Sequence, residues 1–219
     1  VQEMADFVCL GFDLAFKYRT PAMILADGIV GQMMEKVKLP KQRARRTDAE
    51  IAAQCPWAVT GRPATRKPNI MTTLELESST MEENNHRLQA TYEKIRRNEV
   101  RYQEYYTDDC EYLIVAFGSI ARICLKAIEE ARVKGIKVGL IRPITLWPFP
   151  TDAIAAMADR VKGILTVEIN AGQMVEDVRL AVNGKVPVYY YGRMGGIVPN
   201  PSEVIEALYR DFPEINPER

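Results

Sequence analysis

The chain has 219 residues, of which 47% are hydrophobic, and its 29 basic and 29 acidic side chains give a formal net charge of zero. This composition is typical of a globular protein, and the lack of excess positive charge argues against a nucleic-acid partner. No apolar run approaches the roughly 18 residues that a membrane-spanning helix requires, so we expect no membrane partner.

The first elements predicted are a helix, with apolar residues at helical spacing over 4–16, and a buried strand at 22–26. One helix and one strand cannot complete an α/β layer, so we interpret the chain as the carboxyl-terminal part of a longer polypeptide. The strand runs into Asp27-Gly28, with Gly31-Gln32 three residues further on. Such a sequence is typical of a turn, and the functional alternative is a loop at the edge of a site.

Residues 35–68 are predicted to be a linker or arm. Their basic run from Lys36 to Arg46 is interrupted by Pro40 and has little aromatic content, which favours a solvated or subunit-facing segment over a nucleic-acid site. A long helix is predicted at 82–106, with a stripe that includes Tyr92 and Tyr102, and we expect it to lie across a neighbouring surface.

After a turn at 107–109, four strand–helix units follow, with strands at 112–117, 137–141, 163–168 and 186–191. Ser119, Thr151 and Ser202 are predicted to cap the helices. The pattern predicts an α/β fold of three layers with a parallel sheet. Gly118-Ser119 is also a place where free helix N–H groups can bind an anion, although the dinucleotide-binding glycine motif is absent.

Cysteine and histidine, two common metal-binding residue types, are few. The four cysteines, Cys9, Cys55, Cys110 and Cys124, include no Cys-x-x-Cys pair, which predicts reduced thiols in a cytoplasmic protein and no cluster on this chain. The single histidine, His86, excludes a two-histidine metal site, and we expect it to be solvated or capping a helix rather than acting as a base.

The candidate site residues follow the parallel strands, because ligands meet such sheets at the carboxyl ends of their strands. Arg142 either binds an anion or pairs with Glu168 across adjacent strands, and Trp147 is predicted to be a packing anchor or an interface residue. Glu168, with the two amides Asn170 and Gln173, either binds a polar group or completes a tight turn.

The loop at Gly195-Gly196 precedes the last helix. Two glycines there allow either a close approach to an anion or a structural turn, and the turn is the more ordinary interpretation.

Five stretches resemble the alpha subunit of 2-oxoacid:ferredoxin oxidoreductases. They are 22–32 (AMILADGIVGQ), 140–150 (LIRPITLWPFP), 167–174 (VEINAGQM), 192–196 (GRMGG) and 86–95 (HRLQATYEKI). The last is most similar to the type that acts on 3-methyl-2-oxobutanoate, followed by the 2-oxoglutarate type. The resemblance is collinear over nearly the whole chain.

The resemblance implies oxidative decarboxylation of a 2-oxoacid to an acyl-CoA with reduction of ferredoxin. In the assembled enzyme it implies thiamine diphosphate, Mg, iron–sulfur clusters and coenzyme A as co-substrate. It also implies a thiamine diphosphate-binding beta subunit, a gamma subunit and a ferredoxin-like subunit as partners, with ferredoxin as the acceptor.

The resemblance further implies three regions. Residues 1–40 correspond to the remaining part of a pyrimidine-type thiamine-binding domain, 41–107 to a linker with a long connector helix, and 108–219 to a transketolase C-terminal-like domain. The part that carries the cofactor-activating glutamate of the family has no counterpart here, so no catalytic residue is assigned.

Thiamine diphosphate motifs contain Gly-Asp-Gly followed by a distant Asn, whereas here Ala26 precedes Asp27 and Gln54 stands at the matching distance. We therefore expect this stretch alone to bind no cofactor and to be inactive. Two alternatives remain at this point. One is the carboxyl-terminal half of a pyruvate-dehydrogenase-type E1 beta or transketolase-like chain, and the other is a non-enzymatic subunit-assembly domain.

Overall fold

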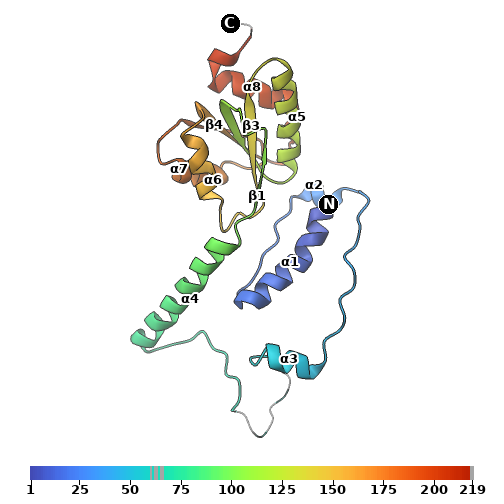
Figure 1. Ribbon diagram of the computed structural model, residues 1–219, viewed down its shortest axis with the longest axis vertical. Coiled ribbons are helices and arrows are strands. Elements are labelled where there is room, and N and C mark those ends of the chain that lie inside the picture. The colour runs from blue at the N-terminus through green and yellow to red at the C-terminus, as the bar shows by residue number, and fades with distance from the viewer. Residues whose placement is uncertain (60, 62–63, 65–66, 218–219) are drawn as a thin grey trace. The chain divides into compact units, whose positions relative to one another are not determined.

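The computed structural model describes residues 1–59, 61, 64 and 67–217. The chain divides into two compact units, the first made of Val1–Ile24 with Glu35–Thr91 and the second of Leu25–Met34 with Tyr92–Arg219 (Figure 1).

The first unit contains helices α1 (Gln2–Tyr18) and α3 (Asp48–Gln54) and the first turns of α4 (Ser78–Asn98). The predicted first helix is thus confirmed, but α1 buries none of its residues. The predicted strand at 22–26 was wrong: residues 21–27 belong to no helix or strand. A strand is stable only when a neighbour completes its ladder, and no strand lies in the described part of this unit.

The second unit is built on a five-stranded sheet with strand order β1-β3-β2-β4-β5. The strands are β1 (Tyr102–Tyr105), β2 (Tyr112–Val115), β3 (Val138–Pro143), β4 (Gly163–Glu168) and β5 (Val188–Gly192). Strands β2 to β5 are parallel, as predicted, and β1 adds an antiparallel edge against β3, so the sheet is mixed.

The edge strand β1 corrects the predicted helix at 82–106. Helix α4 ends at Asn98, and Tyr102, predicted on its apolar stripe, lies opposite Pro143 in the sheet. Residues 99–106 contain one valine and three tyrosines, which favour strands. Pairing with β3 satisfies backbone groups that would otherwise be exposed at the sheet edge.

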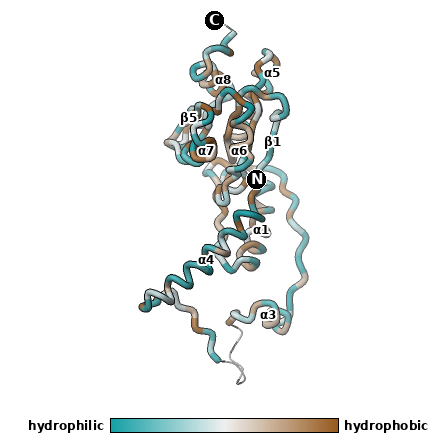
Figure 2. Tube along the Cα trace, turned by 60° about the vertical axis from the view of Figure 1, so that its left-hand side comes forward, coloured by the Kyte–Doolittle hydropathy of each residue, from teal (hydrophilic) through white to brown (hydrophobic). Residues whose placement is uncertain are grey.

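Two layers of helices cover the sheet, with α5 (Ser119–Val133) and α8 (Pro201–Asp211) on one face and α6 (Thr151–Ala158) and α7 (Met174–Val182) on the other (Figure 1). A 3₁₀ turn, η1 (Pro213–Ile215), follows α8. Successive strand residues point to opposite faces, so Ile114 joins one core cluster and Leu113 the other. Figure 2 shows the hydrophobic strands enclosed by these helices. The predicted three-layer α/β fold is confirmed.

Three predicted helix caps were wrong. The cap residues are Gly118 for α5, Pro150 for α6 and Asn200 for α8, so Ser119, Thr151 and Ser202 lie inside their helices. Asn200 forms a capping box with Glu203 and is followed by a proline, which has no N–H to satisfy at that position.

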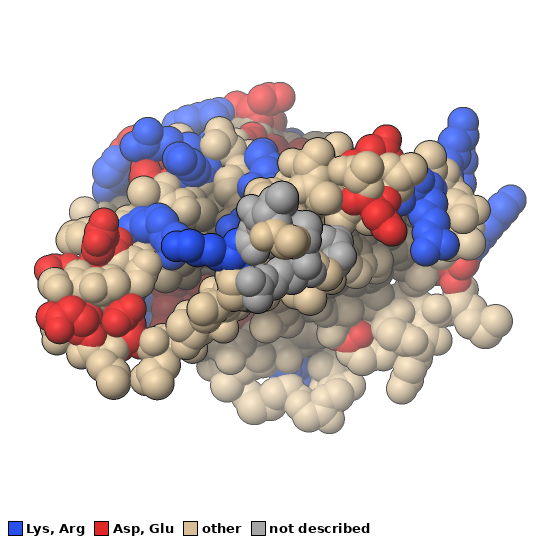
Figure 3. Space-filling view, turned by 90° about the horizontal axis from the view of Figure 1, so that it is seen from below, with Lys and Arg blue, Asp and Glu red and all other residues tan. Residues whose placement is uncertain are grey.

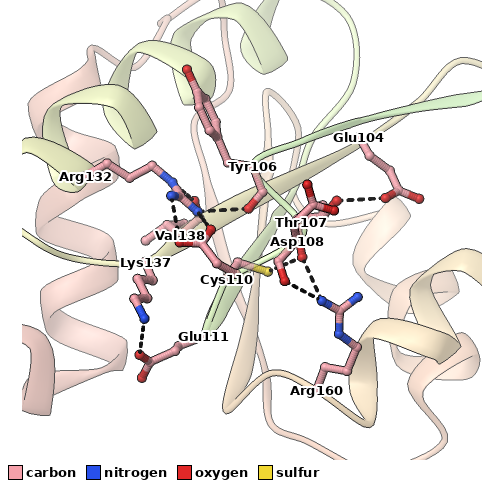
Figure 4. Close-up of polar contacts among 11 residues, drawn as sticks. Glu104, Tyr106, Thr107, Asp108, Cys110, Glu111, Arg132, Lys137, Val138 and Arg160 are labelled. Carbon is pink, nitrogen blue, oxygen red and sulfur yellow. Dashed lines mark hydrogen bonds and ion pairs between the residues drawn. The ribbon is translucent and has the colours of Figure 1, made fainter.

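Two arginines fix the connection between β1 and β2 (Figure 4). Arg132 of α5 donates to the carbonyl oxygen of Tyr106 at 2.9 Å and forms an ion pair with Asp109 at 2.7 Å. Arg160, just after α6, donates to the carbonyl oxygens of Thr107 at 3.2 Å and Asp108 at 2.7 Å. Guanidinium groups thus replace the missing ladder partners of this turn, which lies at the amino ends of the parallel strands.

Candidate functional site

The carboxyl ends of the four parallel strands lie at one edge of the sheet, where the loops after β2, β3, β4 and β5 come together. From β2 the chain continues into α5 on one face, whereas from its neighbour β4 it continues into α7 on the opposite face. The ends of β2 and β4 are therefore the topological switch point, where open α/β sheets usually bind ligands.

Glu168 ends β4 at the switch point and is only 1% exposed. Its Oε2 accepts hydrogen bonds from the backbone N–H of Met174 at 2.9 Å and of Gln173 at 3.3 Å, and its Oε1 accepts from Val175 N–H at 3.0 Å. The carboxylate thus satisfies the free amides at the start of α7 and lies at the positive end of that helix.

The two amides near Glu168 have different surroundings. Asn170 donates from its side-chain nitrogen to Glu168 at 3.0 Å and accepts at Oδ1 from Gly172 N–H at 2.7 Å. Gln173 is exposed, occupies the cap position of α7 and makes no side-chain cap hydrogen bond. Glu168 and Asn170 therefore form one network that completes a tight turn, and this geometry favours the structural alternative for both.

The Asn170 turn also packs closely against β5. The hydroxyl of Tyr190 donates to the carbonyl oxygen of Asn170, and a Cβ atom added at Gly192 would lie 2.7 Å from the same oxygen. Gly192 is thus required for close approach between the two strand ends, a constraint that composition alone does not reveal.

Arg142 does not face Glu168 across adjacent strands, because β2 runs between β3 and β4. Instead its Nη1 donates to Oε1 of Gln103 on the edge strand at 2.6 Å. The predicted pairing was wrong because the chain order of the strands differs from their order in the sheet.

Trp147 lies in the loop after β3 and is 53% exposed. Its ring meets Tyr92 of α4 edge-on at 5.6 Å, and the guanidinium of Arg96 lies 5.8 Å from its centroid. Phe149, two residues on, packs against the core cluster beneath α6 and α7. The loop therefore has one inward anchor, Phe149, and one half-exposed aromatic ring, Trp147.

Asp27 precedes the short helix α2 (Gly28–Gln32), which carries the predicted residues Gly28, Gly31 and Gln32. One carboxylate oxygen of Asp27 accepts from the N–H of Val30 at 2.7 Å, and the other accepts from the Ser119 hydroxyl at 2.5 Å. Burial disfavours the charged form, but these hydrogen bonds outweigh it and lower the pKa of the Asp27 carboxyl.

Asp27 and Gly118-Ser119 were predicted as separate features, and the structure brings them into contact. Gly195 and Gly196 have φ values of 69° and 88°, and a Cβ atom at either would meet nothing within 4 Å. These left-handed conformations agree with the structural turn.

Comparison with known proteins gives matches along nearly the whole chain. The family model described as pyruvate flavodoxin/ferredoxin oxidoreductase, thiamine diphosphate-binding, matches residues 1–102, and the model for pyruvate:ferredoxin oxidoreductase core domain II matches residues 110–204. Ketoisovalerate oxidoreductase subunit VorB of Methanothermobacter thermautotrophicus is 42% identical over 95% of this chain. The 2-oxoglutarate synthase subunit KorA of the same organism is 30% identical over 96% of it.

The chain belongs to the family of 2-oxoacid:ferredoxin oxidoreductase subunits. The resemblance noted in the sequence is thereby confirmed. The chain spans 57% of the length of the VorB relative and 61% of the KorA relative.

A solved structure of 2-oxoglutarate:ferredoxin oxidoreductase from Magnetococcus marinus shares the fold. It aligns with a TM-score of 0.55 and 19% identity over 65% of this chain and 24% of that chain. That structure contains 2-oxoglutarate, coenzyme A and succinyl-CoA.

The family model that matches residues 1–102 is described as thiamine diphosphate-binding, so the described residues were compared with what a metal ion or a diphosphate requires. Among those residues, no three His, Cys, Asp or Glu side chains gather closely enough to bind a metal ion, and all four cysteines are free thiols. At the switch point, Asp27 contacts the start of α5 and Glu168 contacts the start of α7. Carboxylates of this chain therefore already occupy the two helix starts at which a diphosphate could bind.

Three further features of this oxidoreductase subunit concern its helices and its surface. Within the described ranges, no helix has the length and apolar character to cross a membrane. Figure 3 shows basic and acidic side chains interspersed on the face that it presents. His86 is an exposed residue inside α4, so it is solvated and does not cap the helix.

Proposed function

We propose that this chain is part of the alpha subunit of a thiamine diphosphate-dependent 2-oxoacid:ferredoxin oxidoreductase, with 3-methyl-2-oxobutanoate as the 2-oxoacid. The observation that carries the proposal is the 42% identity to a ketoisovalerate oxidoreductase subunit, against 30% to a 2-oxoglutarate synthase subunit of the same organism. In this reaction the 2-oxoacid loses carbon dioxide, its acyl group passes to coenzyme A and the released electrons reduce ferredoxin.

The reactive groups of this enzyme belong to other chains in our proposal. Thiamine diphosphate and Mg are bound by the beta subunit, the iron–sulfur clusters by a ferredoxin-like subunit, and a gamma subunit completes the assembly. Two observations support this assignment. Asp27 and Glu168 occupy the starts of α5 and α7, and no metal-binding cluster is found among the described residues. The free thiols support a cytoplasmic location.

The part played by this chain is assembly and closure of the active site. The sheet unit supplies the half-exposed Trp147 and the α2 segment, which we propose contact neighbouring subunits, and residues 1–40, 41–107 and 108–219 remain our proposed regions. Tryptophan is enriched among the residues that anchor protein interfaces, and Trp147 is 53% exposed.

The test is reconstitution. The chain, as encoded by its own gene, is co-expressed with the beta, gamma and ferredoxin-like subunits, and ferredoxin reduction is followed with 3-methyl-2-oxobutanoate, 2-oxoglutarate and pyruvate. We expect fastest turnover with 3-methyl-2-oxobutanoate and none when this chain is omitted. Equal turnover without it overturns the assigned role, whereas a preference for 2-oxoglutarate overturns only the substrate.

A second measurement addresses the cofactor. Calorimetric titration of the chain alone with thiamine diphosphate is expected to show no binding. Micromolar affinity contradicts the proposal that the cofactor is bound by the beta subunit.

A further inference from the structure

Helix α5 begins at the switch point without a cap from its own loop. Its cap residue is Gly118, with φ 66°, and no side chain at that position satisfies the first amides. The first amides of a helix require acceptors, and here they face the edge of the sheet where ligands commonly bind.

The acceptor comes from residue 27, which is 92 positions away in sequence from Ser119. Asp27 Oδ2 accepts from the Ser119 hydroxyl at 2.5 Å, and a Cβ atom added at Gly118 would lie 3.8 Å from the same oxygen. The carboxylate therefore lies directly against both of the first residues of α5. Hydrogen bonds from the Ser119 and Val30 amides also contribute to the lowered pKa of Asp27, although burial opposes it.

The other oxygen of Asp27 caps α2 through the N–H of Val30 at 2.7 Å. One carboxylate thus joins two helix starts, and a negative charge at both is favourable. Asp27 lies in the region matched by the thiamine diphosphate-binding model, and Ser119 lies in the region matched by core domain II. The contact therefore connects the two matched regions of the chain.

Glu168 has the equivalent position on the other side of the switch point, where it contacts the start of α7. Both helix starts that flank the switch point are consequently satisfied by carboxylates of this chain. Glu168 belongs to the adjoining strand, whereas Asp27 belongs to a distant segment that must be brought to the sheet.

We propose that Asp27 acts as an internal anionic ligand of α5, a latch that fastens residues 25–34 to the sheet at its switch point. The latch determines where α2, with Gly31 and Gln32, is presented. This inference concerns the chain itself and does not rest on the proposed enzymatic function.

The test is hydrogen–deuterium exchange on the full-length protein, comparing wild type with Asp27→Asn, Ser119→Ala and the double variant. Asparagine retains an oxygen that can cap Val30 but has no charge, and Ser119→Ala removes only the hydroxyl donor. We expect each single variant to raise exchange about tenfold in residues 28–34 and in the first turn of α5. Because both substitutions break the same contact between Asp27 and Ser119, exchange in the double variant should be no faster than in either single variant.

The matched control is Asp152→Asn, which removes an exposed acid from the first turn of α6 and should leave both segments unchanged. Additive effects of the two single variants overturn the latch. Ser119→Ala is a mild change that keeps the protein folded. If residues 28–34 exchange at the wild-type rate in this variant, the latch is also overturned. If only residues 28–30 respond to Asp27→Asn, Asp27 caps α2 alone and the latch is likewise excluded.

Acidification gives an independent readout. A carboxyl whose pKa is lowered by folding contributes stability above its unfolded pKa and loses it as the pH falls through the folded pKa. Exchange of residues 28–34, corrected for its intrinsic pH dependence, should therefore rise at acid pH in wild type and stay flat in Asp27→Asn. The same rise in both proteins contradicts the proposal.

Discussion

At the residue scale, two buried or half-buried carboxylates stabilise helix starts at the switch point, where ligands commonly bind. Glu168 and Asp27 each accept hydrogen bonds from the first residues of a helix. A carboxylate accepts on both of its oxygens and carries a charge, whereas a neutral amide of similar size has a single acceptor oxygen. An acid at a strand end is thus an ambiguous signal in sequence, and its neighbours decide its role.

Glu168→Gln tests this structural role. Glutamine retains one acceptor oxygen, but its NH₂ group would face the α7 amides, so buried N–H groups lose their partner and the charge is lost. We expect the free energy of unfolding to fall by about 2 kcal/mol, as measured by urea denaturation. Glu176→Gln, an exposed acid in the first turn of the same helix, should cost roughly 0.5 kcal/mol or less. An inactive Glu168→Gln protein of unchanged stability would assign Glu168 to the chemistry instead.

Thr166 provides the opposite case. It lies on β4 opposite Val115, is fully buried, and its hydroxyl has no hydrogen-bond partner among the described residues. Thr166→Val replaces the hydroxyl with a methyl group of similar shape, so we expect a gain of about 1 kcal/mol in the free energy of unfolding.

The matched control for Thr166→Val is Thr145→Val. The Thr145 hydroxyl accepts from the N–H of Arg101 at 2.9 Å, so its loss should lower stability by a similar amount. Thermal denaturation measures both variants. A destabilised Thr166→Val protein would indicate that an ordered water binds the hydroxyl.

At the element scale, the helices and strands of the sheet unit were predictable because burial repeats with their own periods. All four predicted strands of the parallel sheet are present in the structure, and β4 has the predicted bounds. The edge strand β1 was missed because four residues with mostly exposed side chains show no clear alternation and follow directly on a helix.

The candidate site was less predictable than the fold. Local patterns identified Glu168 and Asn170 as neighbours, because they share a single turn. The contact between Asp27 and Ser119 depends on how distant segments pack, and no periodicity records it. The one available signal was that α5 starts at Gly-Ser without an acidic residue in its first turn, so its cap had to come from elsewhere.

The loop between β3 and α6 allows a prediction at this scale, because its two aromatic residues face different surroundings. Trp147→Ala removes a half-exposed ring and is expected to weaken association with the beta subunit about tenfold, or ~1.4 kcal/mol, with little change in melting temperature. Phe149→Ala removes an inward anchor and is expected to cost about 3 kcal/mol of stability. Pull-down with tagged beta subunit and thermal melting separate the two effects.

Equal pull-down of Trp147→Ala and wild type, with a much lower melting temperature, would make Trp147 a core residue packed on Tyr92. If the variant loses both binding and stability, binding is compared at a temperature where the variant is fully folded. Recovery of wild-type binding at that temperature would likewise make Trp147 a core residue.

At the scale of the whole molecule, the two units differ in how their apolar side chains are used. The sheet unit contains two core clusters, whereas Cys55 is the one buried hydrophobic residue among the described residues of the first unit. There Phe12 is 65% exposed and Leu76 88% exposed. Its long-range polar contacts include the ion pair of Arg43 with Asp13 at 2.5 Å, and both partners of this pair are largely exposed. Such contacts stabilise little, so the first unit should open far more readily than the sheet unit.

Limited trypsin digestion of the chain without its partners measures this difference. Arg43 in the basic segment and Lys126 in α5 have similarly exposed side chains, 63% and 58%, so trypsin reaches both side chains equally. Cleavage also requires the backbone to unfold locally, and the helix of Lys126 packs on the core, whereas residues 36–46 lie outside any helix or strand. We therefore expect cleavage within 36–46 to be roughly a hundredfold faster than after Lys126, leaving a fragment that retains the sheet. Comparable rates at the two sites, read by mass spectrometry over time, would mean that the sheet unit has no independent stability and that both units unfold together.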